Sequence, residues 1–173
     1  MNIETEILKE HSKQQSMKIA SWIGGNKDRF AELMELFLNG DYRITQRSVW
    51  IISLCVEQYP SLATPWLRKM IKKTQEADVH DAVKRNAVRL LQFVDIPRSL
   101  QGTVANLCFA FLQSADTPIA VKAFSMTVLA NIAKQEPDLK YELKAVIDLM
   151  LPYSGAGIQS RGKKVLSQLA KNK

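Results

Sequence analysis

The sequence predicts an all-α protein built from repeated pairs of helices, and two observations lead to that fold class. Residues 41–62 carry apolar or small side chains at offsets of zero, four, seven, eight and eleven from Ile44, a spacing that falls on one stripe of an α-helix. The same template returns further along the chain, with copies that start at Val83, Val121 and Ile158. A fixed period of this length is the sequence signature of a helical repeat protein.

A small residue stands at the second offset of every copy, and these residues are Ser48, Ala87, Ser125 and Gly162. Two helix backbones approach closely only where side chains are short, so we expect the four positions to be buried at helix crossings. An upstream copy has Ser16 at the small position but the polar Ser12 at the first offset. It is interpreted as a degenerate terminal repeat, because the ends of a repeat array face water.

The elements follow in order from this template. Residues 3–23 are predicted to form one leading helix that the tandem glycines Gly24 and Gly25 end, because glycine supplies the left-handed conformation of helix stops. Asn26 caps the next helix, and Asp28 lies in its first turn, where a carboxylate favours the helix dipole. That helix ends before Asp41, where the template helix begins.

A second apolar signature, a pair, a gap of two and another pair, precedes each template copy. It consists of Leu33, Met34, Phe37 and Leu38, then Trp66, Leu67, Met70 and Ile71, then Leu107, Cys108, Phe111 and Leu112, then Val146, Ile147, Met150 and Leu151. The repeating unit is therefore two helices, and the six prolines lie at the joints. No alternating apolar pattern predicts a sheet. We expect four helix pairs and a leading cap helix, about nine helices in one domain over residues 1–173.

This pattern resembles HEAT or armadillo repeats over essentially the whole chain. The resemblance rests on the period near 40, on D-x-x-I at residues 41–44 and 116–119, and on proline between units. It implies a right-handed α-α superhelix. The basic residue usual after the first stripe position is present as Lys84 and Lys122 but is replaced by Thr45 and Gln159 in the outer copies. A continuous ladder of ion pairs within the repeats is therefore not expected.

The composition narrows the possible functions. The formal charge is +7, and the basic excess lies in residues 41–77 and 154–173.

No apolar run is long enough to span a membrane and residues 1–10 are not a signal peptide, so we expect a cytoplasmic protein without a membrane partner. Cys55 and Cys108 fall within apolar stripes, which favours core packing over a disulfide or redox pair.

Catalytic and metal-binding patterns are not found in the sequence. His11 and His80 lie in polar surroundings without a cluster of metal ligands, and both are interpreted as solvated surface side chains. Gly24 and Gly25 lack the further residues of a phosphate-binding loop. The catalytic loop of the fumarase and adenylosuccinate lyase group is also absent. We predict no catalytic residue, no metal site and no cofactor.

A candidate binding surface lies opposite the apolar stripe of the template helices. At 100° per residue, the opposite direction carries mainly cations and one aromatic residue. They are Trp50, Arg85, Arg89, Lys134, Lys164 and Lys171, with Arg43 pointing nearly the same way. The resemblance would place them on one concave surface. The alternative is an ordinary solvated face, because the third copy offers only Ala123, Thr127 and Ala130 there.

Two functions from different classes remain. The first is a non-enzymatic module whose concave surface binds a protein or peptide, with Trp50 as an anchor or, alternatively, as a core residue. The second is nucleic-acid binding, in the manner of the HEAT-like alkylpurine DNA glycosylases, with Arg43, Arg85, Arg89 and Lys164 on phosphates. No catalytic residue of that family can be matched here. The sequence leaves the partner and the oligomeric state open.

Overall fold

The computed structural model describes residues 1–171, which contain helices and no strand. The chain folds as two compact units, unit 1 (Met1–Asp95) and unit 2 (Ile96–Lys173). Unit 1 contains α1 (Ile3–Lys9), α2 (Lys13–Ile23), α3 (Lys27–Asn39), α4 (Tyr42–Gln58), α5 (Leu67–Lys73) and α6 (Asp81–Leu91), with 3₁₀ turns at Pro60–Leu62 and Thr64–Trp66. Unit 2 contains α7 (Arg98–Gln113), α8 (Ile119–Ile132), α9 (Leu139–Met150) and α10 (Ala156–Lys171), with a 3₁₀ turn at Leu151–Tyr153.

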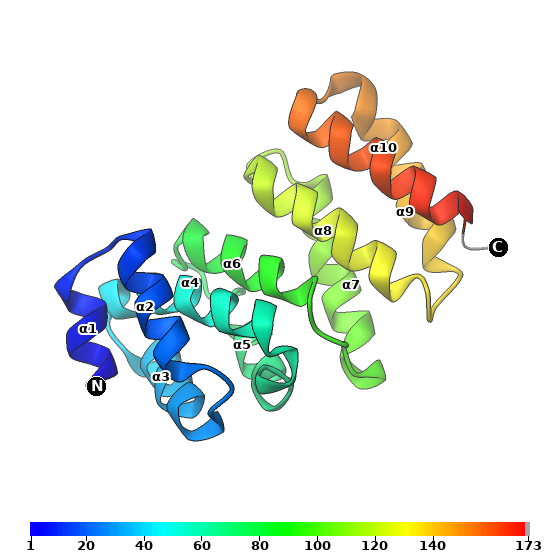
Figure 1. Ribbon diagram of the computed structural model, residues 1–173. Coiled ribbons are helices and arrows are strands. Elements are labelled where there is room, and N and C mark those ends of the chain that lie inside the picture. The colour runs from blue at the N-terminus through cyan, green and yellow to red at the C-terminus, as the bar shows by residue number, and fades with distance from the viewer. Residues whose placement is uncertain (172–173) are drawn as a thin grey trace. The chain divides into compact units, whose positions relative to one another are not determined.

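Unit 1 is a two-layer arrangement of helices (Figure 1). The template helix α4 lies between α2 and α6 and packs on α3, while α3 contacts α1 and α5. The layers are therefore α2, α4 and α6 on one side and α1, α3 and α5 on the other. In unit 2, the template helix α8 packs against α7, α9 and α10. The all-α repeat architecture predicted from the sequence is confirmed.

The prediction of one leading helix over residues 3–23 is wrong, because α1 and α2 are separate helices that form a hairpin. Each has its own cap: Asn2 Oδ1 accepts from the Thr5 amide at 2.8 Å, and Ser12 Oγ accepts from the Gln15 amide at 3.1 Å. Ser12 and Gln15 have the spacing of a capping box, a signal already present in the sequence. The described residues thus contain ten α-helices rather than about nine.

The small positions of the template are buried, as expected. Ser48 and Ser125 are fully enclosed, and Ala87 and Gly162 are also buried. The Ser48 hydroxyl donates to the Ile44 carbonyl in its own helix at 2.7 Å, so it needs no partner across the crossing. At Gly162, an added Cβ would lie 2.8 Å from Leu151 Cδ2 and 3.1 Å from Ile147 Cγ2, which shows how closely α10 crosses α9 and the turn after it.

The other apolar positions of the template are buried in the core, with two exceptions. Val94 lies beyond the end of α6 and is half-buried, and Leu166 is half-buried on α10. The joints follow the predicted chemistry: Gly24 has a φ of 52°, which favours glycine, and the Asp41 carboxylate accepts from the Ile44 amide at 2.8 Å. Among the described residues, no helix is both long enough and apolar enough to cross a membrane.

Candidate binding surface

Trp50 lies on α4 at a position that is partly open to solvent. Its indole is half-buried and meets the exposed His11 ring edge to face, with 6.4 Å between ring centroids and 77° between planes. Arg47, one turn earlier, donates to the carbonyls of Ile7 and Leu8 at 3.0 Å each. These contacts attach the end of α1 to α4 and hold His11 beside the indole. Part of the Trp50 ring remains accessible to a partner.

Arg89 extends from α6 and binds two side chains of α4. Its Nη2 lies 2.6 Å from Glu57 Oε2 in an ion pair, and its Nη1 donates to Ser53 Oγ at 3.1 Å. Ser53 is fully buried, so Arg89 donates to a hydroxyl that has no exposed surface. The guanidinium therefore joins two template helices, and a partner would meet it only through its remaining donors.

Arg43 and Arg85 differ from Arg89 in being exposed. Arg43 lies seven residues before Trp50, which is two turns along the same face of α4. Arg85 lies one turn before Arg89 on α6. Within the described part of the chain, neither guanidinium has a hydrogen-bond or ion-pair partner. The structure thus brings four of the predicted residues, Arg43, Trp50, Arg85 and Arg89, to adjacent helices of unit 1.

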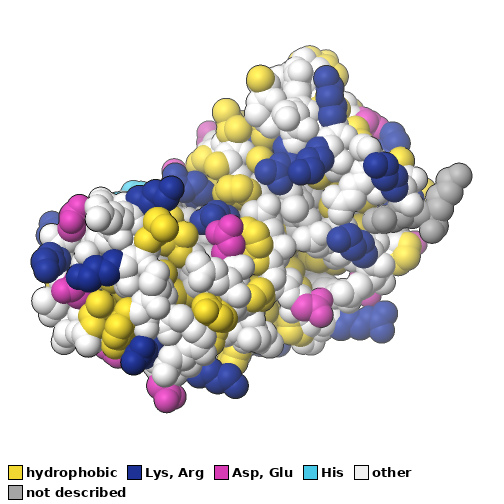
Figure 2. All heavy atoms as spheres, in the orientation of Figure 1, with side chains coloured by type: hydrophobic (Ala, Val, Ile, Leu, Met, Phe, Trp, Pro, Cys, Tyr) yellow, Lys and Arg dark blue, Asp and Glu magenta, His cyan; other side chains and the backbone are white. Residues whose placement is uncertain are grey.

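Lys134 and Lys164 belong to unit 2, as does Lys171. All three lysines are exposed, and Lys134 Nζ donates to Asn131 Oδ1 at 3.2 Å. Figure 2 shows Lys and Arg side chains over α8 and α10, whereas charged side chains are sparse over α4. The sequence template also missed Arg161, whose Nη1 donates to Thr127 Oγ1 at 2.6 Å and so joins α10 to α8.

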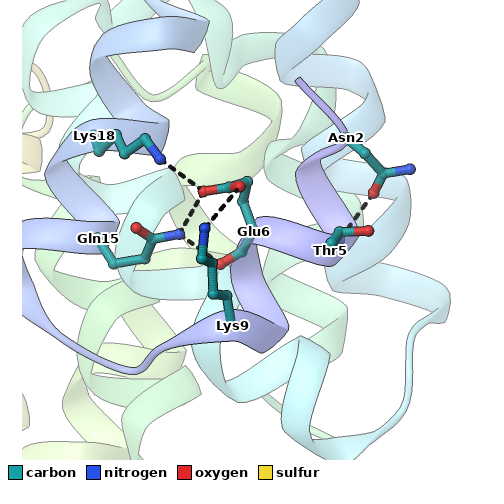
Figure 3. Close-up of polar contacts among 6 residues, drawn as sticks. All are labelled: Asn2, Thr5, Glu6, Lys9, Gln15 and Lys18. Atoms are coloured by element: carbon teal, nitrogen blue, oxygen red, sulfur yellow. Dashed lines mark hydrogen bonds and ion pairs between the residues drawn. The ribbon is translucent and has the colours of Figure 1, made fainter.

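Lys18 on α2 is a further residue at the sequence position equivalent to Trp50 and Arg89. Its Nζ lies 2.9 Å from Glu6 Oε2, and the same oxygen accepts from Gln15 Nε2 at 2.8 Å (Figure 3). These two hydrogen bonds stabilise the carboxylate and lower the pKa of Glu6 from its ordinary value of 4.5 to about 2. Lys9 adds a second, longer ion pair at 3.7 Å. This cluster holds α1 against α2.

Two other cations bind backbone carbonyls at the carboxyl ends of helices, and helical periodicity does not predict these contacts. Arg29 donates to the Trp22 carbonyl at 2.6 Å near the end of α2, and its guanidinium stacks 4.1 Å from the centre of the Trp22 ring. Lys73 donates to the Leu38 carbonyl at 3.4 Å near the end of α3. Cations at these ends satisfy free carbonyls and complement the helix dipole. Part of the basic excess is thus structural.

The two histidines have different surroundings. His11 is exposed, as expected, but His80 is half-buried and caps α6: its Nδ1 accepts from the Ala82 amide at 2.9 Å. Its ring also meets the Tyr42 ring edge to face, with 5.5 Å between centroids. A cavity of about 290 Å³ opens beside it and is lined by residues that include Lys73 and Asp78. Interpreting His80 as a solvated side chain missed its role as a helix cap.

Both cysteines are buried and therefore present no accessible thiol at this surface. Burial raises the pKa of the Cys55 thiol and of the Cys108 thiol to about 12 each, so both stay protonated near neutral pH. In the described residues, no three His, Cys, Asp or Glu side chains gather as metal ligands. The described surface of unit 1 therefore offers an aromatic ring and guanidinium groups for contact.

The paired helices, the buried small positions and the two-layer packing define a helical repeat protein. The family model described as HEAT repeat domain matches residues 3–169. Because this match covers nearly the whole sequence, the chain belongs to the HEAT repeat domain family. A search of curated proteins and a search of solved structures each found no match.

Proposed function

We propose that the chain is a non-enzymatic scaffold that binds a protein or peptide along the outward face of its template helices, the face expected to be concave. The observation that carries the proposal is the half-buried Trp50, flanked on α4 and α6 by the exposed Arg43 and Arg85. Tryptophan and arginine are enriched among the residues that contribute most binding energy at interfaces. Helical repeats also present extended, rigid surfaces to their partners.

Charge reversal at the two exposed arginines tests this proposal without disturbing the core. The double variant Arg43→Glu with Arg85→Glu is expected to keep the wild-type melting temperature, because both side chains are exposed. It should lose a stoichiometric partner that the wild-type chain captures from a cell lysate. Trp50→Ala should lose the same partner, but that variant can also lose packing, so it is the second test.

The matched control is Arg68→Glu with Lys72→Glu, which makes the same change in net charge on exposed positions of α5 in the other layer. Capture of the partner by this control and not by the Arg43 and Arg85 variant would support the proposed face. Equal loss in both variants, or no stoichiometric partner of the wild-type chain, would contradict it.

Nucleic-acid binding is the second candidate, and the charge of α10 favours it. Lys163, Lys164 and Lys171 are exposed there, and residues 154–173 contain no acidic residue. The predicted phosphate contacts are Arg43, Arg85 and Arg89 in unit 1 and Lys164 in unit 2, and each contact made would add a slope of about −0.9 in log affinity against log salt for duplex DNA. DNA binding measured across a salt series tests this candidate, and no binding at low salt would exclude it.

A further inference from the structure

A lysine-rimmed groove lies at the carboxyl ends of two helices in unit 2. Its described lining includes Lys134 after α8, Lys140 at the start of α9 and Lys171 at the end of α10, and it includes no carboxylate. The groove has a volume of about 700 Å³, and the buried Leu169 forms part of its apolar wall. Tyr141 also lines it and keeps 74% of its surface exposed, so an aromatic side chain projects among the three cations.

An acid-rimmed groove of about 700 Å³ lies in unit 1. Its described lining brings together four carboxylates from two helices, α1 and α3, and from the joint before α4, with no cation among them; they are Glu4, Glu32, Glu35 and Asp41. All four side chains belong to exposed residues. Leu36 and Ile44 supply apolar lining between them. The second groove therefore has the opposite charge of the first and an apolar wall that suits an aromatic ring.

We infer that these two surfaces bind one another between copies of the chain, so that the protein self-associates head to tail. Tyr141 of one copy would insert between the carboxylates and contact Leu36 and Ile44, while Lys134 and Lys171 approach the acidic rim. Opposite potentials on two patches favour this orientation and disfavour like-to-like contacts. The contact is heterologous, because each copy uses two different patches, and so it allows chains longer than a dimer.

The chemistry of the contact predicts a weak and salt-sensitive association. Its charges are exposed, and exposed ion pairs contribute little individually and are screened by salt. Sedimentation equilibrium at about 20 mM salt should therefore give an average mass that rises with concentration toward at least twice the 19.6 kDa of one chain. At about 0.5 M salt, the mass should return to that of the monomer.

Charge-reversal variants test which patches make the contact. Lys134→Glu with Lys171→Glu should stay monomeric at low salt, and so should Glu32→Lys with Glu35→Lys. An equimolar mixture should associate again, because the first variant keeps the acidic groove and the second keeps the lysine-rimmed groove. Tyr141→Ser should lose association with no change in charge. The control is Lys163→Glu with Lys164→Glu on α10, which lie outside the lining and should leave association unchanged.

Three outcomes would overturn the inference. The wild-type chain could remain at 19.6 kDa at every concentration and salt tested. The Lys163 and Lys164 control could lose association as fully as the groove variant, which would show an effect of net charge alone. Finally, a monomeric chain could bind a short DNA duplex and lose that binding only with Lys134→Glu and Lys171→Glu, which would assign the groove to a polyanion.

Discussion

Gly162 offers a direct test of how closely the paired helices cross. In the exposed interior of a helix, replacing glycine by alanine stabilises a protein by about 0.5–1 kcal/mol. At Gly162, the new Cβ would lie 2.8 Å from Leu151 Cδ2 and 3.1 Å from Ile147 Cγ2, so both side chains would have to shift. Overpacking of this kind costs about 1–3 kcal/mol. Leu151 is half-buried and its Cδ2 is the end of a flexible side chain, so we expect the lower end of that range.

Gly162→Ala should therefore leave the free energy of unfolding unchanged or lower it by up to about 1 kcal/mol. Gly162→Leu should lower it by at least about 1 kcal/mol, because a larger side chain meets the same neighbours. The matched control is Gly102→Ala, within α7 of the same unit, where an added Cβ meets nothing within 4 Å. This control should gain about 0.5–1 kcal/mol.

Urea unfolding followed by circular dichroism at the helix band measures these differences, with thermal unfolding as a second assay. For a chain of this size, about 1 kcal/mol corresponds to a shift of about 2–4 °C in melting temperature. Gly102→Ala should therefore melt above the wild-type chain, and Gly162→Ala should not. An equal gain in the two alanine variants would refute the close crossing of α10 over α9 and the turn that follows it.

The remaining predictions concern acid stability, thiol reactivity and core volume. Because the folded state lowers the pKa of Glu6 to about 2, its stabilisation is complete above about pH 4.5 and is lost toward pH 2. In urea unfolding, Glu6→Gln should be less stable than the wild type at pH 7 and equal to it near pH 2, whereas Glu10→Gln serves as an exposed control. Ellman's reagent should label Cys55 and Cys108 slowly in the folded chain and rapidly in urea, since burial raises both pKa values to about 12; rapid labelling of the folded chain would contradict the burial. Ala87→Leu should cost about 1–3 kcal/mol in the same unfolding assay, and an unchanged midpoint would show that the crossing has room.

Most of the fold could be predicted because every unit of a helical repeat has the same packing requirement at the same sequence position. The small positions Ser48, Ala87, Ser125 and Gly162 share one offset, and all four are buried. The hairpin of α1 and α2 was not predicted, because apolar residues continue on both sides of its turn. There, the Ser12 cap is the better evidence, since it satisfies the Gln15 amide, which a single helix over residues 3–23 would not leave free.

The candidate surface was only partly predictable, because helical periodicity gives the direction of a side chain but not its partner. Arg85 and Arg89 share a face of α6, yet Arg85 is exposed while Arg89 binds Glu57 of α4, which lies 32 residues away in the chain. That difference depends on the register between two template helices. A template fitted to each helix separately contains no information about this register.

The template position shared by Lys18, Trp50 and Arg89 shows how such a surface can be separated into structural and binding residues. Lys18 is paired with Glu6, and Arg89 is paired with Glu57. At the same position of α8, Thr127 accepts from Arg161. The outward polar groups of the template helices are thus used largely to join neighbouring helices, and the formal charge of +7 is a poor guide to a partner.

Outward residues that do not join helices in this way are more informative. In unit 1 they are the accessible ring of Trp50 and the exposed guanidinium groups of Arg43 and Arg85. This contrast is the reason to test Arg43 and Arg85 together before any other cation of the chain.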